Sequence, residues 1–245
     1  MTERITSKEN PKIKEALKAA SAKDDLFLAE GYHLVEMALE AGYVVRLFSV
    51  KPYSYPGVET ILINDALLHR LAFSKNPEGI VALCHKPSPK KPQGDVVLYL
   101  DRVQDPGNVG TLLRSALAFS CHDIVLSKGT AEVFAPKTIM ASQGAVFRLN
   151  LYESKADPVE DIQQLKDDGY YLLGTDLKSS LPLKELLVPH KFVLILGNEG
   201  QGVDSDVLAL TDARVRIEMS GIDSLNVGVA GGILLYELCQ TRHDS

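Results

Sequence analysis

The chain has 245 residues, 45% of them hydrophobic, so it can bury the core of one large domain or of two modest ones. Its formal net charge of −6 argues against a surface coated with positive charge for nonspecific nucleic-acid binding, although a local basic patch can still contact phosphates. No apolar run reaches the roughly 18 residues of a membrane span, and the first residues do not resemble a signal peptide.

Three cysteines, Cys84, Cys121 and Cys239, lie far apart in the sequence. Their odd number and their spacing indicate neither a disulfide framework nor a metal site, and the six histidines show no paired ligand spacing. This use of cysteine is typical of a reducing compartment. We therefore expect a soluble cytoplasmic protein that binds no metal.

The chain begins with a basic arm. Residues 8–22 have the spacing of an amphipathic helix, with Ile13, Leu17 and Ala20 on its inner side. The cations of this arm can contact RNA phosphates, but a solvated helix face is the commoner meaning of such a run. Before residue 24 the cations are Arg4, Lys8, Lys12, Lys14, Lys18 and Lys23, and the acids are Glu3, Glu9 and Glu15.

Strands and helices alternate after this arm, which indicates an α/β layer. Strands are predicted at 27–29, 44–50, 60–63 and 79–84, and helices from Gly31 to Leu39 and at 65–72, the latter capped by Asn64 or Asp65. Residues 86–94 then contain three prolines and a glycine, a composition that favours an extended linker. We place a first domain at 1–90 and a second at 94–245.

The second domain repeats the alternation. The continuous apolar run at 192–196 is typical of a parallel sheet buried on both faces. Strands are predicted at 96–100, 123–126, 145–149, 170–175, 192–196 and 215–219, and helices at 109–119, 136–142, 158–168 and from 224 onward.

Three loops follow three of these apolar strands, at 104–110, 197–202 and 219–224. Ligands of an open parallel sheet bind outside the carboxyl ends of its strands, so we expect these loops to converge on one crevice. The glycine-rich loop 197–202 lacks the lysine of a phosphate-binding P-loop and the spacing of a dinucleotide fingerprint. Its glycines can let backbone atoms approach a flat ligand, although a tight turn with a solvated Glu199 is the alternative.

The stretch 217–238 closes the chain with a strand exit and an apolar helix. Asp223 or Ser224 can cap this helix, and Asn226 stands in its first turn. Its three glycines weaken a helix interior, so we expect close packing of another backbone or of a ligand against them. A capped core helix, with Asn226 bonded to a neighbouring loop, is the plainer interpretation. The glycines are Gly228, Gly231 and Gly232.

This stretch resembles the third motif of the SpoU (TrmH-like) branch of the SPOUT RNA methyltransferases, whose usual form is Ile-Pro-Met-x-Gly…Ser-Leu-Asn-Val-Ser-Val-Ala. Glu218 replaces the usual proline and Gly228 the second serine, whereas the core from Ser224 to Val227 is intact. Loop 197–202 resembles the second motif of the family, and residues 105–114 resemble the first. Residues 27–31 and 76–82 resemble parts of the small substrate-binding domain that precedes many SpoU domains.

The resemblance implies a fold, a reaction and a set of partners. The fold is a parallel-sheet domain with a carboxy-terminal trefoil knot, preceded by a small α/β RNA-binding domain. The reaction is transfer of the methyl group of S-adenosyl-L-methionine to a ribose 2′-hydroxyl of rRNA, or of tRNA. The family's active sites form at the interface of a homodimer, so we expect a homodimer that binds RNA and has no membrane or metal partner.

The resemblance also assigns residues. Asn108 can cap its helix, and Arg114 lies under two turns later, close enough to reach back toward the mouth of that helix. Arg114 is implied in catalysis, together with Asn108, Glu199, Ser224 and Asn226. The cofactor-binding residues implied by the motifs are Thr175, Leu196, Gly197, Asn198, Gly202, Ile217, Met219 and Leu225.

Two other functions fit parts of the pattern. A non-catalytic RNA-binding or ribosome-assembly factor that retains the cofactor pocket would be favoured by loss of Asn108, Arg114 or Asn226, and all three are present. An enzyme of the same superfamily that modifies a base is the second alternative, and the Asn108/Arg114 pair argues against it.

Overall fold

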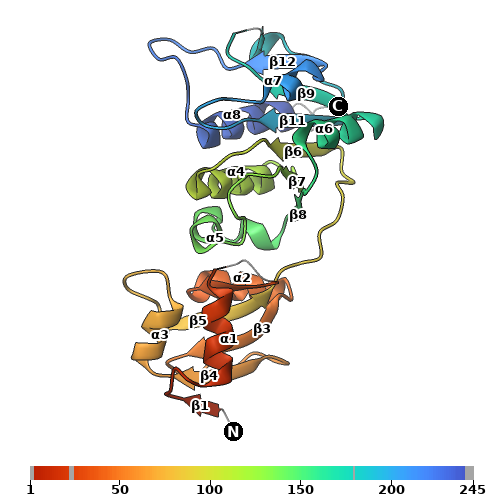
Figure 1. The fold of residues 1–245 in the computed structure, drawn as a ribbon. Coiled ribbons are helices and arrows are strands. Elements are labelled where there is room, and N and C mark those ends of the chain that lie inside the picture. The colour runs from red at the N-terminus through yellow and green to blue at the C-terminus, as the bar shows by residue number, and fades with distance from the viewer. Residues whose placement is uncertain (1–2, 22–24, 179, 241–245) are drawn as a thin grey trace. The chain divides into compact units, whose positions relative to one another are not determined.

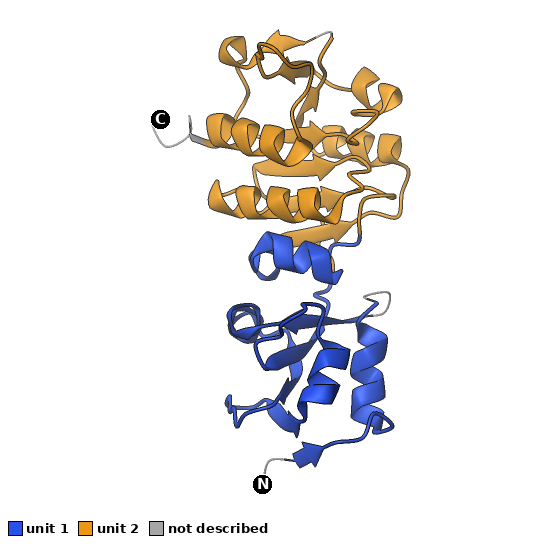
Figure 2. Cartoon of the chain, turned by 90° about the vertical axis from the view of Figure 1, so that its left-hand side faces the viewer, with its two compact units in different colours: residues 1–88, 132–147 blue, residues 89–131, 148–245 orange. Residues whose placement is uncertain are grey.

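The computed structural model describes residues 3–21, 25–178 and 180–240, so Lys23 of the basic arm lies outside the described residues. The chain divides into two compact units. Unit 1 contains residues 1–88 and 132–147, and unit 2 contains residues 89–131 and 148–245 (Figure 2). The division after residue 88 falls inside the proline-rich segment, whereas residues 132–147 group with unit 1 although the sequence assigns them to the second domain.

Unit 1 is built on a five-stranded sheet in the order β1-β4-β3-β5-β2. Strands β1, β4 and β3 are mutually parallel, and β5 runs antiparallel to both β3 and β2. The strands are β1 (Glu3–Ile5), β2 (Leu26–Glu30), β3 (Val44–Ser49), β4 (Glu59–Ile63) and β5 (Ile80–His85). Its helices are α1 (Pro11–Ala19), α2 (Tyr32–Glu40), α3 (Asp65–Leu71) and α5 (Pro136–Ser142), followed by the 3₁₀ turn η1 (Ala145–Phe147) (Figure 1).

Helix α1 is shorter than the helix predicted at 8–22. It begins at Pro11, because the Asn10 side chain accepts a hydrogen bond from Lys12 N at 2.9 Å and proline suits the first helical position. Ile13 is buried as expected. Residues 3–5, which the sequence places in an arm, instead pair with β4 as an edge strand.

The basic arm carries less free positive charge than its composition suggests. Lys12 Nζ lies 2.6 Å from a carboxylate oxygen of Glu3 and 2.5 Å from one of Glu59. Lys14 pairs with Glu9 at 2.6 Å. The pairs of Lys12 tie α1 to strands β1 and β4, whereas that of Lys14 is local, and together they neutralise part of the predicted phosphate-binding charge.

Residues 132–147 join unit 1 through aromatic and sulfur contacts. The rings of Phe27 and Phe134 lie 4.8 Å apart. Gly144 has φ +86°, and a Cβ built on it would lie 2.1 Å from the sulfur of Met37. The packing therefore needs glycine here for both its backbone conformation and its lack of a side chain.

Unit 2 is a seven-stranded sheet in the order β10-β12-β9-β11-β6-β7-β8, with every pair parallel. Its strands are β6 (Val96–Leu100), β7 (Asp123–Leu126), β8 (Asn150–Glu153), β9 (Tyr171–Thr175), β10 (Leu181–Pro182), β11 (Phe192–Leu196) and β12 (Ala213–Arg216). Its helices are α4 (Pro106–Ala118), α6 (Pro158–Asp167), α7 (Ser205–Ala209) and α8 (Val227–Gln240), with the 3₁₀ turn η2 (Leu183–Glu185).

Alternate residues of the central strands serve opposite faces of this sheet. Val97 and Tyr99 of β6 belong to one buried cluster with Ile162 of α6 and Val207 of α7. On the other face α4 and α8 lie side by side (Figures 1 and 2). Both faces are thus covered, which explains why β6 and β11 are apolar at every position.

Several predicted boundaries in unit 2 were wrong. The strand predicted at 145–149 is the 3₁₀ turn η1 followed by β8 at 150–153, so the pairing segment starts later. The strand predicted to end at residue 219 ends at 216, and the last helix starts at 227 instead of 224. Two short elements, β10 and α7, were not predicted.

No helix within the described part of the chain is long and apolar enough to cross a membrane.

Candidate active site

The three glycine- and asparagine-bearing loops meet at the carboxyl edge of the unit 2 sheet. Strands β6 and β11 are neighbours that end level with each other, with Leu100 opposite Leu196. The backbone N–H of Asp101 continues this pairing by donating to Leu196 O at 2.8 Å. The loops that follow β6 and β11 therefore start side by side, at the carboxyl edge of the sheet where ligands of open parallel sheets bind.

Glu199 joins the loop after β11 to the loop after β6. Its two carboxylate oxygens accept hydrogen bonds from the backbone amides of Gln104 and Asp105, both at 3.1 Å, and from Asn108 Nδ2 at 3.0 Å. Partial burial acts to raise the pKa of Glu199, but these bonds and its own backbone amide outweigh burial and hold the pKa below its usual range. Glu199 is therefore an ionised anchor for the first loop, not a proton donor or acceptor near neutral pH.

Asn226 extends this connection to the third loop. Its Nδ2 donates to Asn108 Oδ1 at 2.8 Å, so Asn226, Asn108 and Glu199 form a continuous chain of hydrogen bonds across the three loops. Its Oδ1 accepts from the amides of Gly228 at 2.9 Å and Val229 at 3.2 Å. One amide group thus orders the start of α8 and the link to α4.

These contacts correct two predicted caps. The cap of α8 is Asn226, not Asp223 or Ser224, because the helix begins at residue 227. The cap of α4 is Asp105, whose side chain accepts from Asn108 N at 2.8 Å. The amide side chain of Asn108 is consequently free of capping and is used between the loops.

The loop after β11 is a tight, self-bonded turn. Asn198 and Gly202 exchange two backbone hydrogen bonds, at 3.0 and 2.8 Å, and Gly202 has φ +73°. A Cβ built on Gly197 would lie 2.0 Å from the backbone nitrogen of Val203. Gly197 is therefore required for close approach of this chain to itself, and the approach of a flat ligand to this loop stays a prediction.

A pocket of about 760 Å³ opens between this turn, the end of β9 and the segment 215–227. It is lined by three of the residues implied in catalysis, Glu199, Ser224 and Asn226. Asn108 does not line the pocket, but it is hydrogen-bonded to Glu199 and Asn226, which do. All eight residues implied in cofactor binding line the same pocket, namely Thr175, Leu196, Gly197, Asn198, Gly202, Ile217, Met219 and Leu225.

The pocket has the size and chemistry that S-adenosylmethionine needs. Its volume lies within the range of small-molecule sites, about 300–1,000 Å³. Apolar side chains such as Leu196 and Ile217 form part of its lining and suit an adenine ring. The hydroxyls of Thr175 and Ser224 add polar groups to the wall, although Thr175 Oγ1 already donates to Ile195 O at 3.0 Å.

Arg114 is exposed on α4 and is not among the residues that line the pocket. Among the residues that the structure describes, its guanidinium has no hydrogen bond or ion pair, so it is available to a ligand. Six positions along α4 separate Arg114 from Asn108, and Arg114 takes no part in the hydrogen-bond chain of the three loops.

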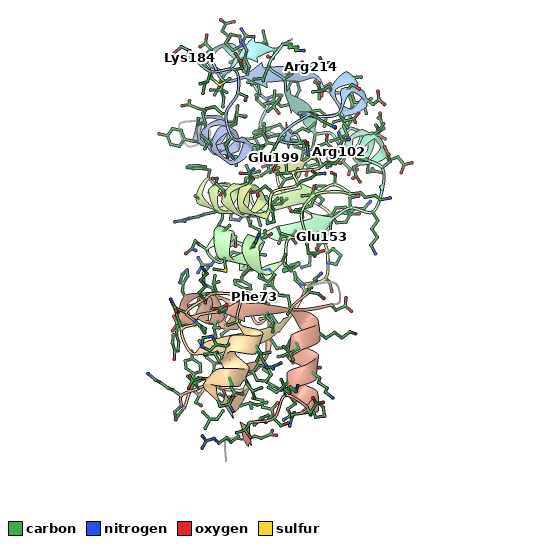
Figure 3. The ribbon with its side chains drawn as sticks, turned by 60° about the vertical axis from the view of Figure 1, so that its left-hand side comes forward. Phe73, Arg102, Glu153, Lys184, Glu199 and Arg214 are labelled. Carbon is green, nitrogen blue, oxygen red and sulfur yellow. The ribbon has the colours of Figure 1, made fainter. Side chains whose placement is uncertain are left out.

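Asp101 and Arg102 support the site and were missed by sequence reasoning. Asp101 is fully buried and accepts from Arg102 Nε at 3.0 Å and from the amide of Asp204 at 2.8 Å. Arg102 has φ +56°, and its carbonyl accepts from Asn198 Nδ2 at 2.9 Å. Figure 3 shows Arg102 and Glu199 at this same edge. The only sequence signal was an acid placed directly after an apolar strand.

The family model for SpoU rRNA methylases matches residues 95–236, more than half of the chain. The chain belongs to the SpoU rRNA methylase family. A second model, for the MRM3-like substrate-binding domain, matches residues 10–82 of this SpoU protein. The two matches lie on either side of the proline-rich segment.

Relatives of this SpoU protein extend over nearly its whole length. A Bacillus subtilis protein named 23S rRNA (guanosine(2553)-2′-O)-methyltransferase RlmP is 35% identical over 96% of this chain and 98% of its own. The solved structure of an AdoMet-bound rRNA methyltransferase from Sinorhizobium meliloti superposes with a TM-score of 0.86, at 28% identity over 99% and 98% of the two chains. A putative RNA methyltransferase of the TrmH family from Porphyromonas gingivalis gives a TM-score of 0.84, at 30% identity over 94% of this chain and 97% of its own.

Proposed function

We propose that this protein methylates a ribose 2′-hydroxyl of ribosomal RNA with S-adenosylmethionine as methyl donor. The observation that carries the proposal is the hydrogen-bond chain Asn226–Asn108–Glu199, which joins three loops beside a pocket of about 760 Å³. The family membership and the named activity of the Bacillus subtilis relative support the same reaction and argue against the non-catalytic alternative. The substrate-binding model over residues 10–82 supports an RNA substrate for unit 1.

The roles in binding follow from the lining of the pocket. Leu196, Ile217 and Leu225 would enclose the adenine, and the turn 197–202 would contact the ribose and the methionine end through its backbone. When bound, S-adenosylmethionine supplies a methyl carbon on a positively charged sulfur. Glu199 does not take a proton in this scheme, because its lowered pKa keeps it ionised and its oxygens are occupied.

Arg114 would act on the RNA side of the reaction. A guanidinium stays protonated in proteins, so Arg114 cannot serve as the base. Its five donors suit a ribose hydroxyl and the adjacent phosphate, and holding the hydroxyl oxygen in line with the methyl carbon supplies much of the rate. Bound S-adenosylmethionine would supply the methyl group, and Arg114 would orient the ribose hydroxyl, whose proton would pass to phosphate or water.

The proposal is tested by two measurements on the same preparation. Isothermal titration should give saturable binding of S-adenosylmethionine to the full-length protein. RNA from cells that lack the protein, incubated with it and tritiated S-adenosylmethionine, should gain label in a large-subunit rRNA fragment at a 2′-O-methyl nucleotide identified by mass spectrometry. Label in tRNA alone would exclude the rRNA substrate, and cofactor binding without any labelled RNA would favour the assembly-factor alternative.

The carboxy-terminal segment is proposed to pass through a loop of the chain, forming a trefoil knot. The residues between β9 and β11 line a second pocket together with Ile217, Glu218 and Ile233, and Arg216 Nη1 donates to Ser180 O. The last helix then packs on α4, far along the sheet from β12. A knotted chain stretched from both ends would extend less than the about 3.3–3.6 Å per residue of a free chain.

A homodimer is proposed from the exposed face of α8. Val229, Ile233 and Tyr236 follow one another at helical spacing and are 50%, 37% and 43% exposed. Ile222, just before the helix, is 57% exposed. Contiguous apolar surface of this kind marks an interaction site, and two-fold pairing is the commonest oligomer. The free, buried cysteines are compatible with our proposal of a cytoplasmic location.

A further inference from the structure

One edge of the unit 1 sheet brings several loops together. Glu30 at the end of β2 lies opposite Val81, and Ser49 at the end of β3 lies opposite Ile80. Because β5 runs antiparallel to both strands, the carboxyl ends of β2 and β3 meet the amino end of β5. The loops 31–32, 50–58 and 72–79 therefore leave the sheet at one place.

Aromatic side chains gather at this edge. The rings of Tyr32 and Tyr53 lie 6.2 Å apart at an interplanar angle of 47°. Burial, Glu36, and the neighbouring hydroxyls of Tyr32 and Tyr55 raise the pKa of Tyr53, so the three phenols are close to one another. Tyr55 is 37% exposed. We call Tyr32, Tyr53, Tyr55 and Phe73 the aromatic rim.

Phe73 is held at the same edge by a buried acid. Glu30, 9% exposed, accepts hydrogen bonds from the amides of Phe73 at 2.5 Å and Ser74 at 3.1 Å, and also from the Ser74 hydroxyl. Further along this loop, Glu78 accepts from the amide of Tyr32 at 2.9 Å. The ring of Phe73, labelled in Figure 3, is nevertheless 37% exposed. The ring of Phe73 is therefore held in place by its backbone while part of its surface is accessible to a partner.

The segment that carries Tyr53 and Tyr55 is stiff. Parallel strands usually need a crossover of about a dozen residues or more, commonly a helix, but β3 and β4 are joined by residues 50–58 alone. Pro52 and Pro56 flank the tyrosines, and Val58 N closes a turn by donating to Tyr55 O at 3.2 Å. Little conformational entropy would be lost when such rings bind a partner.

Free positive charge accompanies these rings. Lys51 and Lys75 are exposed, and within the described residues neither ammonium group has a hydrogen bond or ion pair. This contrasts with Lys12 and Lys14 on α1, which are paired. Cations beside aromatic faces are the combination that binds single-stranded nucleic acid, through phosphates and stacked bases.

We propose that the aromatic rim binds unpaired bases of the RNA substrate by stacking. The inference rests on the proposed function and deepens it, because it assigns the substrate contact of unit 1 to unpaired nucleotides at this edge. In an A-form duplex the faces of the bases are stacked on one another, whereas splayed bases of single strands offer their faces to aromatic rings. The paired charges of α1 leave it a weaker candidate for the RNA contact.

Substitutions that keep or remove ring faces test the proposal. In the full-length protein, Tyr53→Leu/Tyr55→Leu removes two faces but retains apolar area, and Tyr53→Phe/Tyr55→Phe keeps both. The probes are a fluorescein-labelled 12-nucleotide RNA without base pairing and a blunt RNA duplex of the same length. The Leu pair should weaken binding of the unpaired RNA by about tenfold or more, because each stacked base contributes substantially, and should change duplex binding less than about twofold. The Phe pair should match the parent.

Each other outcome overturns the proposal. If the Leu pair binds unpaired RNA as tightly as the parent does, stacking is excluded. If the Leu pair loses the same affinity for the unpaired RNA and the duplex, the contact is to phosphates. If the Phe pair loses as much affinity as the Leu pair, the tyrosine hydroxyls make the contact. Melting temperature and S-adenosylmethionine affinity serve as folding controls, and Phe73→Leu repeats the test with one change on the neighbouring loop. If the aromatic rim binds RNA, the Leu pair should have a higher KM for RNA and an unchanged kcat. If the proposed function is wrong, the parent protein itself will not methylate RNA, so the two failures can be told apart.

Discussion

At the scale of single residues, Glu199 differs from an acid that performs proton transfer. Three donors converge on it, and a carboxylate can accept all three because both oxygens carry lone pairs. Glu199→Gln keeps the shape but turns an NH₂ group toward a donor. Hydrogen bonds to a charged group contribute about 1.5–3 kcal/mol each, so S-adenosylmethionine affinity should fall by about tenfold or more in titration calorimetry. Glu185→Gln, exposed on η2, is the matched control and should bind normally.

The lowered pKa of Glu199 also fixes a pH dependence. The pKa of Glu199 is lower in the folded protein than in the unfolded chain, where the pKa of a glutamate is about 4.3. Ionised Glu199 therefore stabilises the folded state at pH values above about 4.3, and this stabilisation is lost as the pH falls through the lower pKa of the folded state. Cofactor affinity should therefore be flat from about pH 5 to 8 and decline only in more acid solution. A midpoint near neutral pH that disappears in Glu199→Gln would contradict the role of Glu199 as an ionised anchor.

Arg114 gives a different signature, because it is exposed and unpaired within the described residues. Arg114→Ala should reduce the methylation rate by about 100-fold or more, equivalent to about 2.7 kcal/mol, with cofactor affinity within a few-fold of the parent. Arg114→Lys should fail nearly as badly, since an ammonium cannot reproduce a planar fork. Calorimetry and a tritiated-methyl assay on one preparation separate the two quantities. Loss of cofactor binding in proportion to activity would indicate a structural residue.

At the scale of elements, the contact between α4 and α8 explains the glycines of the last helix. A Cβ on Gly231 would lie 2.2 Å from Leu112 Cδ2 and 2.6 Å from Leu196 Cδ1, and both leucines are buried. Gly232 is looser, with Ser115 Oγ at 3.3 Å. Gly231 is closely packed, but the side chains of Leu112 and Leu196 fill the space, and not the second backbone that the sequence led us to expect.

These two glycines form a matched pair of substitutions. Gly231→Ala should destabilise the protein by about 1–3 kcal/mol through overpacking, and it should weaken cofactor binding because Leu196 lines the pocket. Gly232→Ala should be neutral or stabilising by up to about 1 kcal/mol, since alanine favours a helix interior. Denaturant unfolding of both variants gives the comparison. Equal destabilisation would mean that helix backbone, not the Leu112 and Leu196 contacts, decides the choice of glycine.

Much of this architecture could be predicted from sequence, and the failures have physical causes. Long apolar strands such as β6 and β11 were located, because burial on both faces leaves a continuous signal. Helix starts were misplaced, because Asp105 and Asn108, or Asp223, Ser224 and Asn226, are all competent caps and only tertiary contacts select one. Short pieces such as β1 and β10 have too few residues to show a period.

The site was predictable in outline for a similar reason. Loops that follow the strands of a parallel sheet meet at one edge of it, and most of the residues that the motifs assign line the pocket there. The pairing of Asn226 with Asn108 could not be read from the sequence, because 118 positions separate them. The sequence also could not show that Arg114 has no ion-pair partner among the described residues, because that depends on how the acidic side chains around it are placed in the fold.

At the scale of the whole molecule, the exposed face of α8 bears on assembly. If this face pairs with a second copy, Val229→Lys should place two charges in an apolar contact and shift the protein to monomer. Because Val229 is exposed, the far-UV circular dichroism spectrum of the variant should still be that of a folded protein. Sedimentation equilibrium at micromolar concentration measures the shift. Gln163→Lys on the exposed side of α6 supplies the same charge elsewhere and should stay dimeric. A parent protein that sediments at 26.8 kDa would rule out the homodimer.

The two-sided use of the Asn226 side chain has a kinetic consequence. Its oxygen accepts from the amides of Gly228 and Val229, while its nitrogen donates to Asn108. Asn108 in turn donates to Glu199, whose carboxylate also accepts from the amides of Gln104 and Asp105. Deuterium should consequently enter these four amides in one cooperative opening, although they lie more than a hundred residues apart. Adding S-adenosylmethionine should slow their exchange by a common factor, set by its concentration relative to Kd. Asn226→Ala should uncouple them, leaving the amides of α8 to exchange at a rate that the ligand no longer controls.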